Sequence, residues 1–272
     1  MVVVALRDPQ ARWIALGALP PEQAPWLKRV AAGPSRRELS DADWRDRVAE
    51  FVPSLEHPVP LIADTAYAEV ARAPYASIRS AQSQLDAARL QAWLDDPSLA
   101  RRRPLYTLLL GVAGGAPAAR RVEQQVATAA RERDVTDLSA LLMADMELRG
   151  TSRVAWIERT YLLNRSRSPA EVQAALLALS EQGGVDARVP RARVVEAYRA
   201  FIRSGHALAG YVAPDLGRWK DWSAVPDYAA LVKSGARQHP ASYFAILMYL
   251  DSAPTVEARA AAAALRARAA SS

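Results

Sequence analysis

Two groups of arginine residues are the feature of this sequence whose residue type and spacing best suit binding chemistry. They are Arg101, Arg102, Arg103, Arg120 and Arg121. Guanidinium groups donate hydrogen bonds to phosphate and carboxylate oxygens, so the two groups would contact phosphates if they lay at neighbouring helix ends. Three acidic residues nearby, Glu123, Glu132 and Asp134, dilute the positive field. The arginines are therefore candidate contacts for phosphate groups or for a partner.

A tryptophan pair is the second candidate feature. Trp219 and Trp222 are three residues apart, which places both indoles on one side of a helix that we predict over Asp215–Trp222. Exposed indoles would form an aromatic anchor for a partner protein, because interface hot spots are enriched in tryptophan, tyrosine and arginine. We favour packing between helices as their role, since an anchor requires that the rings be exposed.

The sequence holds no recognised arrangement for histidine, cysteine or serine chemistry. The histidines, His57, His206 and His239, stand outside the H-E-x-x-H pattern of zinc sites, and cysteine is absent. His57 and His239 each precede a proline, which favours a role at a helix start over catalysis. No G-x-S-x-G elbow is present. We therefore predict no catalytic residue, no cofactor and no metal site, and we favour a protein without enzymatic activity.

Two further patterns resemble enzyme sites only in part. The paired carboxylates are Asp41 with Asp43, Asp95 with Asp96, and Asp145 with Glu147. Residues two apart on a helix do not face each other, so helix caps and solvated faces explain these pairs more simply. The run Leu108–Gly115 resembles a strand before a phosphate loop, but it lacks the G-x-G-x-x-G spacing and the G-K-[ST] ending, so we interpret it as a helix end.

Composition indicates a globular chain and leaves its compartment open. With 272 residues, of which 51% are hydrophobic, the chain can bury a sizeable core. The net charge of +6 is carried mostly by arginine, which together with many alanines is typical of a GC-rich genome and weakens any inference from charge. Without cysteine the chain tolerates either redox state, so its localisation stays open. The apolar runs are too short for a transmembrane helix or a signal-peptide core, and we predict neither.

Helices must position the candidate residues, and the clearest predicted helix lies within residues 57–74. Prolines suit its start, and Pro74 disfavours helical geometry at its end. Ile62, Ala66 and Val70 recur at i, i+4 and i+8, so they form one apolar face. We predict that this face packs on a helix over residues 40–52.

Two capping boxes mark other helix starts. Ser168 precedes Pro169 and Glu171, the arrangement of an N-cap with proline at the first helical position and a carboxylate that reaches back. Ser40 and Asp43 form a weaker version of the same signal. Helical spacing continues almost to the end of the chain, and one further helix is predicted over His206–Val212.

Residues 1–39 are predicted to be an irregular segment packed on a helical domain of residues 40–272. Val2–Leu6 and Trp13–Leu19 flank a turn at Asp8–Gln10, so they suit a β-hairpin. A helix that begins at Pro9 is the alternative, and we favour the helix slightly.

Prolines at predicted helix starts recur at irregular intervals along the chain. They are Pro9, Pro58, Pro117, Pro169, Pro214 and Pro254. The intervals suit a helix-pair repeat of about 40 to 47 residues with insertions. In this recurrence of prolines at helix starts the sequence resembles HEAT-like repeat proteins, and residues 57–70 and 168–179 resemble them most. The resemblance implies an all-α fold in which antiparallel helix pairs form a right-handed superhelix. Proline also begins helices in ordinary all-α bundles, which is the other explanation.

The resemblance implies a non-catalytic protein-interaction or scaffold module with an unidentified protein partner. The first alternative is a HEAT-like nucleic-acid-binding protein that uses the arginines on a groove. The second is a hydrolase whose site is assembled from residues far apart in the sequence.

Overall fold

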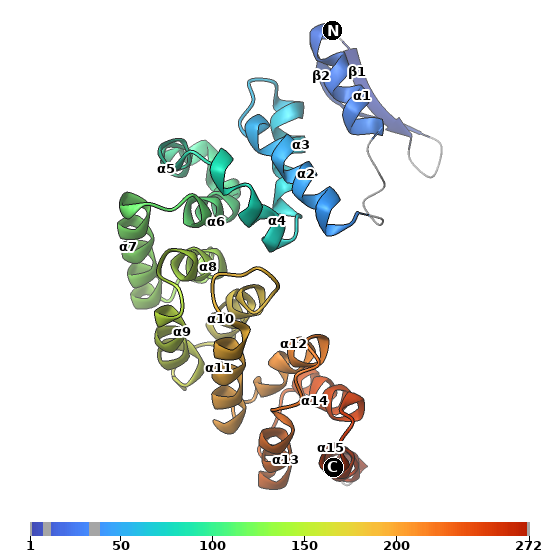
Figure 1. The fold of residues 1–272 in the computed structure, drawn as a ribbon, viewed down its shortest axis with the longest axis vertical. Helices are drawn as coiled ribbons and strands as arrows, with labels where there is room; N and C mark the ends of the chain where they lie inside the picture. Colours follow the sequence, from blue (N-terminus) through green and yellow to red (C-terminus); the bar gives the residue numbers. More distant parts are fainter. Residues whose placement is uncertain (1, 8–11, 33–38, 271–272) are drawn as a thin grey trace. The chain divides into compact units, whose positions relative to one another are not determined.

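The computed structural model describes residues 2–7, 12–32 and 39–270. The chain divides into two compact units, Met1–Leu90 (unit 1) and Gln91–Ser272 (unit 2) (Figure 1). Apart from one two-stranded hairpin, the regular elements of the described residues are helical, which confirms the all-α prediction in this coarse form. The predicted domain boundary between residues 39 and 40 stays a prediction. No helix in the described ranges is long and apolar enough to cross a membrane.

The N-terminal residues form a β-hairpin, so the helix that we favoured there is wrong. Strand β1 (Val2–Arg7) pairs antiparallel with β2 (Trp13–Leu19), with an irregularity in the register between Val4 and Ala5. The three consecutive valines explain the difference, because β-branched side chains are stiff at χ1 and favour strands over helices. The predicted turn at Asp8–Gln10 lies outside the described residues.

Short helices make up the rest of unit 1. They are α1 (Ala24–Ala32), α2 (Asp41–Phe51), α3 (Pro60–Ala71) and α4 (Tyr75–Ser80), and α5 (Ala87–Asp95) crosses into unit 2. Helix α2 begins with the predicted capping box: the Ser40 hydroxyl accepts from the Asp43 N–H at 3.2 Å, and the Asp43 carboxylate accepts from the Ser40 N–H at 2.8 Å. The weak signal at this position is therefore confirmed.

The apolar face of α3 is buried as predicted. Ile62, Ala66 and Val70 are each at most 1% exposed. Helix α3 packs on α2, and Arg47 of α2 donates to Glu69 of α3 with an Nε–Oε2 distance of 2.7 Å. The ion pair joins the same two helices that the apolar face was predicted to join.

Unit 2 is built from helices joined by short turns. They are α6 (Arg103–Ala113), α7 (Ala116–Glu132), α8 (Leu138–Arg149), α9 (Ser152–Ile157), α10 (Pro169–Gln182), α11 (Arg191–Arg203), α12 (Ala213–Arg218), α13 (Val225–Ser234), α14 (Pro240–Ser252) and α15 (Val256–Ala270). A π-helical turn, Glu158–Leu162, continues α9. The capping box of Ser168 and Glu171 opens α10 as predicted.

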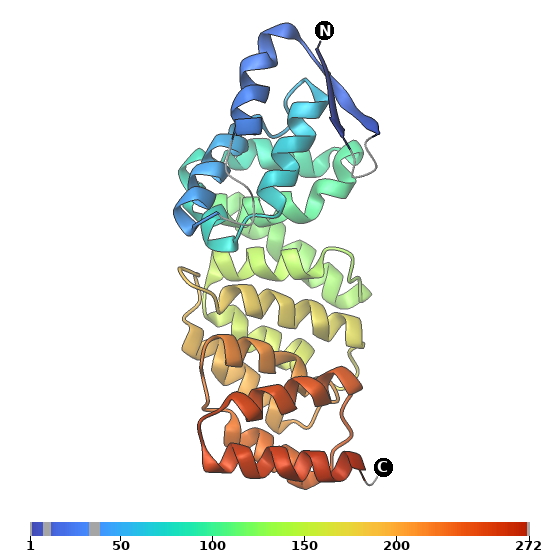
Figure 2. The same ribbon diagram turned by 90° about the vertical axis from the view of Figure 1, so that its right-hand side faces the viewer.

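Alternate helices of unit 2 pack against each other. Helix α6 packs on α8 and α8 on α10; further along, α11 packs on α13, α13 on α15, and α12 on α14. Figure 2 shows the helices of unit 2 stacked one upon the next. Four tyrosines from α6, the π-helical turn, α11 and α13 are fully buried in the core between them: Tyr106, Tyr161, Tyr198 and Tyr228.

Two predicted helix ranges near residue 210 are wrong. Residues 209–212 form a short 3₁₀ turn, where an α-helix over His206–Val212 was predicted. Helix α12 ends at Arg218 and does not reach Trp222, because Lys220 has a φ of +54°. This left-handed conformation is incompatible with a continuing α-helix.

Candidate functional site

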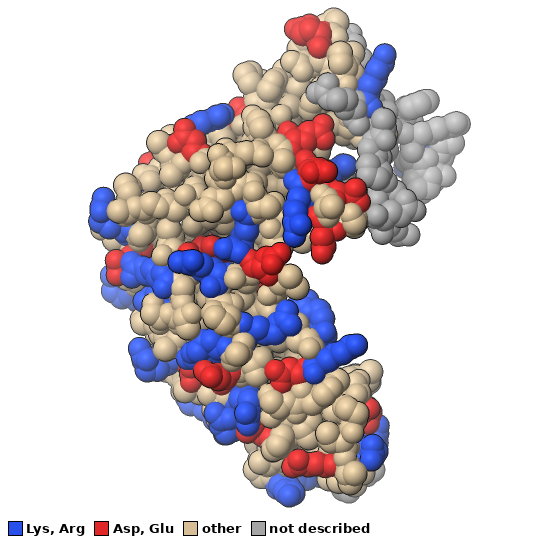
Figure 3. Space-filling model, in the orientation of Figure 1, with Lys and Arg blue, Asp and Glu red and all other residues tan. Residues whose placement is uncertain are grey.

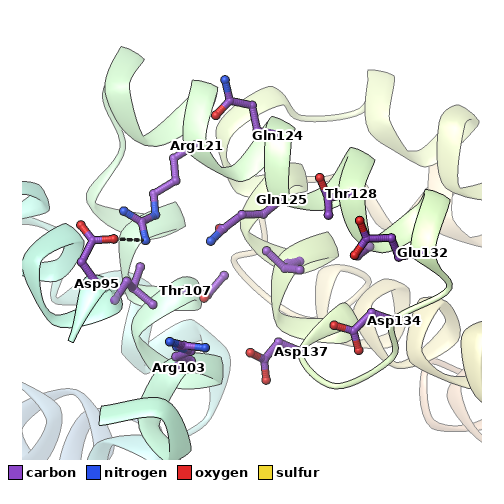
Figure 4. Close-up of a pocket in the computed structure, with 13 residues that line it drawn as sticks. Asp95, Arg103, Thr107, Arg121, Gln124, Gln125, Thr128, Glu132, Asp134 and Asp137 are labelled. Atoms are coloured by element: carbon purple, nitrogen blue, oxygen red, sulfur yellow. Dashed lines mark hydrogen bonds and ion pairs between the residues drawn. The ribbon is translucent and has the colours of Figure 1, made fainter. Parts of the chain in front are cut away.

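A polar cavity of about 490 Å³ lies among α6, α7 and α8 and the C-terminal end of α5 (Figure 4). We call it the α7 cavity. Its lining consists of Leu94, Asp95, Arg103, Thr107, Arg121, Gln124, Gln125, Thr128, Ala129, Glu132, Asp134, Asp137 and Leu141. All of these residues belong to unit 2, so the cavity lies within one compact unit.

Helix α7 supplies one wall of the cavity as a polar stripe. The contributing side chains are Arg121, Gln124, Gln125, Thr128 and Glu132. Their spacing of three and four residues places them on one face of a helix. The adjacent face buries Ala118, Val122 and Val126 against the core. The sequence of α7 thus separates a core-facing side from a side that lines the cavity.

Arg103 makes no hydrogen bond to a described residue, although its charge acts on two carboxylates of the cavity, Asp95 and Asp137. It is the first residue of α6, and no hydrogen bond or ion pair joins its guanidinium to another described residue. Its Nε is buried without a hydrogen-bond acceptor. A shielded donor that carries charge is costly to leave unsatisfied, because it has lost water and gained no replacement.

Arg121 is only partly satisfied. Its Nη2 donates to the Asp95 carboxylate at 2.8 Å, and this bond lowers the pKa of Asp95. The Nε of Arg121 is buried without an acceptor, and the side-chain oxygen of Gln125, one turn further along α7, is buried without a donor. Figure 4 shows Asp95, Arg121 and Gln125 at one end of the cavity, which we call the arginine end, and Arg103 below them, beside Asp137.

Carboxylates occupy the other end of the cavity, which we call the acidic end. It contains Glu132, Asp134 and Asp137 (Figure 4). Burial raises the pKa of Asp137, and the charge of Arg103 opposes that rise. Hydrogen bonds from the N–H and hydroxyl of Thr136 lower the pKa of Asp134 and so keep it ionised. The cavity therefore holds the ion pair of Arg121 with Asp95 at one end and three carboxylates at the other, with Arg103 beside Asp137.

The structure brings two of the five candidate arginines to one cavity. Arg103 and Arg121 line the α7 cavity, and Arg101, Arg102 and Arg120 do not. Arg101 and Arg102 end the 3₁₀ turn before α6, and Arg120 lies exposed on α7. Over the face of unit 2 visible in Figure 3, basic and acidic side chains lie next to one another and do not separate into a single-sign patch.

The two candidate tryptophans contact different partners. Trp219 stacks on Tyr198, with the ring centroids 5.9 Å apart, and the Arg191 guanidinium lies 5.2 Å from its ring centroid. Trp222 packs on Tyr249 at a centroid distance of 5.3 Å. Both side chains are half-buried and lie beyond the end of α12. The expectation that they share one helix face is therefore wrong.

Some of the histidines and paired carboxylates act as local caps. His57 and His239 each accept a hydrogen bond at Nδ1 from a backbone N–H two residues along, which confirms their predicted role at helix starts. Asp96 accepts from the Ser98 N–H in the same way. Asp145 does not act as a cap: it is fully buried within α8 and pairs with Arg149 and Arg153, so the explanation by helix caps and solvated faces is wrong for this residue. No group of three or more potential metal ligands occurs in the described part of the chain.

A second cavity of about 520 Å³ lies among α13, α14 and α15, also within unit 2. Its lining includes Leu231, Val232, Tyr243, Ile246 and Leu265 and is mostly apolar. Phe244 at its edge is 65% exposed.

The sequence prediction missed the α7 cavity. Glu132 and Asp134 were interpreted only as groups that dilute a positive field. The spacing of Arg121, Gln125 and Thr128 places polar residues along one stripe of the helix beside its buried face, which is the ordinary pattern of an amphipathic helix and does not by itself mark a cavity. No local pattern could place Asp95 or Asp137 opposite that stripe, because both come from other elements.

No protein-family model matches this chain, and no curated protein or solved structure matches it in the comparisons that were made.

Proposed function

We propose that the chain is a non-catalytic protein-interaction module of HEAT-like repeat architecture, and that the α7 cavity receives part of the partner. The observation that carries this proposal is the convergence of unsatisfied polar atoms. Arg103 Nε, Arg121 Nε and the Gln125 side-chain oxygen all lack partners and all belong to residues that line this one cavity. Buried polar groups in proteins are normally hydrogen-bonded, so a cluster of exceptions in a cavity is expected where a ligand binds.

The packing of alternate helices supports the repeat architecture. In stacked helix pairs each helix contacts its equivalent in the next pair, and the contacts of α6 with α8, α8 with α10 and α11 with α13 have this form. The proposed arrangement is a right-handed superhelix of antiparallel pairs over residues 40–272. Small-angle scattering of the full chain tests it: an elongated profile supports the superhelix, and a compact profile contradicts it.

Pairing of the buried carboxylates favours binding over acid–base catalysis as the function. Glu171 pairs with Arg167 at 2.7 Å, and Asp227 with Arg199 at 2.6 Å. The Tyr198 hydroxyl donates to Asp215 at 2.8 Å. The bonds of Asp227 and Asp215 join neighbouring helices, and Glu171 stabilises the start of α10, whereas Arg103 and the Gln125 side-chain oxygen in the α7 cavity make no such bond.

Photo-cross-linking tests the proposed interaction. A photoreactive amino acid at Thr128, an exposed residue of the cavity wall, should cross-link to a protein in lysate of the native organism. The same amino acid at Val185, which is 68% exposed and does not line the cavity, serves as the control. Arg103→Gln should abolish the cross-link from position 128. Cross-links that are equal from both positions, or that survive Arg103→Gln, would contradict the proposal.

Nucleic-acid binding is the second candidate, and the convergence of Arg103 and Arg121 favours it. The three carboxylates at the acidic end oppose it, because they repel a phosphate backbone. A nucleic-acid complex would weaken steeply with salt. A gel shift at two salt concentrations with no complex at either would exclude this candidate.

A further inference from the structure

The arginine end of the α7 cavity is suited to a carboxylate. Arg103 donates to no described residue, and Arg121 uses Nη2 alone, for Asp95. Guanidinium groups present parallel N–H donors that match the two oxygens of a carboxylate. A carboxylate that enters the cavity would accept charge-assisted hydrogen bonds from a guanidinium group, and it would satisfy donors that have no acceptor now.

The side-chain oxygen of Gln125 adds a second requirement, because it needs a donor at the same end of the cavity. An isolated carboxylate offers only acceptors. The last residue of a peptide offers both groups on one Cα, since its carboxylate accepts and its amide N–H donates. The unsatisfied atoms therefore match a chain terminus better than they match an isolated carboxylate, and inorganic phosphate, which also carries an O–H donor, is an outcome that the test must exclude.

The acidic end of the cavity favours a ligand that has a cationic side chain near its carboxylate. Glu132 is 59% exposed, and Asp134 and Asp137 line the cavity beside it. Glu132 also pairs with Arg131 at 3.1 Å, and Arg103 acts on Asp137. A cationic side chain placed there would still gain Coulomb attraction from the acidic end, and an anionic one would be repelled. A lysine or arginine beside the terminal residue would supply that cation.

We propose that the α7 cavity binds the carboxyl terminus of a peptide chain that carries a basic residue next to its last residue. This inference rests on the proposed function, because it names the part of the protein partner that enters the cavity. The volume of about 490 Å³ lies within the range of about 300 to 1,000 Å³ that is typical of ligand sites.

Fluorescence anisotropy on the full chain tests the inference without any substitution in the protein. The probe is a fluorescein-labelled hexapeptide, Gly-Ala-Gly-Ala-Lys-Ala, with a free carboxyl terminus. The same peptide with a carboxyl-terminal amide should bind at least about tenfold more weakly, because the charge-assisted bonds to the arginines are lost. Exchange of its lysine for glutamate should weaken binding by a similar factor.

Protein variants then locate the site. Arg103→Gln should weaken the free-carboxylate peptide about tenfold and leave the amide peptide unchanged. Arg120→Gln is the matched control, because Arg120 lies on the exposed side of α7 and does not line the cavity. It should bind like the wild type. Circular dichroism of both variants checks that they fold alike.

Four results would overturn the inference. The first is equal binding of the acid and amide peptides, and the second is an equal effect of the two arginine substitutions. The third is displacement of the probe by inorganic phosphate. The fourth is displacement of the probe by free lysine with the same affinity as the peptide. Failure of the inference is distinguishable from failure of the proposed function. If no peptide binds while the cross-link from position 128 still depends on Arg103, a partner binds through another kind of group. If the cross-link is also absent, the interaction module itself is refuted.

Discussion

Gly111 of α6 lies so close to Ala144 of α8 that a Cβ atom at position 111 would be 2.6 Å from the Cα of Ala144. This distance is too short for any side chain, and it explains why glycine stands in the middle of a helix where it weakens helical propensity. The close contact fixes the separation of two helices that line the α7 cavity. The run Leu108–Gly115 therefore includes a packing glycine as well as the helix end that was predicted there.

Gly111→Ala is expected to destabilise the protein by about 1 to 3 kcal/mol, because the added methyl group must push α6 and α8 apart. Denaturant unfolding measures the effect. Gly217→Ala in α12 is the matched control, since the nearest atom to its added Cβ would be 4.0 Å away. The control should be neutral or slightly stabilising, by up to about 1 kcal/mol. Equal stability of the two variants would refute the close packing of α6 on α8.

Ala66→Leu tests the apolar face of α3 in unit 1. Ala66 is fully buried, so extra methylene groups are expected to cost about 1 to 3 kcal/mol of unfolding free energy. Ala71→Leu is the same substitution at an exposed position at the end of the helix, and it should change stability by less than about 0.5 kcal/mol. Thermal or denaturant unfolding of both variants provides the measurement. Wild-type stability of Ala66→Leu would mean that the buried face has been assigned incorrectly.

Glu171→Ala should be the most destabilising of the carboxylate substitutions in α10 and α11. Glu171 is 1% exposed, completes the capping box with Ser168, and pairs with Arg167 at 2.7 Å. Removal of one partner of a buried pair costs about 3 to 5 kcal/mol. Glu196 is 71% exposed and 3.6 Å from Arg193, so Glu196→Ala should cost at most about 1 kcal/mol. A smaller effect at Glu171 than at Glu196 in chemical unfolding would contradict this ranking.

Peptide binding should weaken on acidification because of Asp137. Burial raises the pKa of Asp137 above its ordinary value of 3.8, so its carboxyl group takes up a proton at a higher pH than an exposed aspartate does. A cationic ligand favours the ionised form, and binding is therefore strongest above the raised pKa and is lost as pH falls through it. Asp137→Asn should remove this part of the pH dependence. Anisotropy titrations between about pH 4 and pH 7 measure it, and identical pH profiles for the two proteins would oppose a contact with Asp137.

The predictable parts of the fold were those with local causes. The capping boxes at Ser40 and Ser168 and the buried stripe of α3 follow from residues within one or two turns of each other, and they were predicted correctly. The N-terminal hairpin was not predicted correctly. Pro9 suits a helix start, and the two strands stabilise each other only by pairing across the turn.

In the candidate site, too, only the features with local causes could be predicted from the sequence. The arginine groups were recognised from sequence, yet only Arg103 and Arg121 enter the cavity, and which ones enter depends on how α6 and α7 pack. The Asp95 partner of Arg121 lies 26 residues away in the chain, a separation at which no helical periodicity applies. The separation of the two tryptophans was equally hidden, since Trp222 follows the left-handed backbone of Lys220, whereas Trp219 stacks on Tyr198 of another helix.

The central claim, that the α7 cavity is the binding site, is tested most directly by a hexapeptide that carries a diazirine on its last residue and a free carboxyl terminus. After irradiation, mass spectrometry identifies the protein residues that have reacted. We predict labels on the cavity wall, at Thr107, Gln125 or Thr128, and their loss in Arg103→Gln. Labels confined to the cavity of α13, α14 and α15, around Leu231 and Tyr243, would contradict the claim.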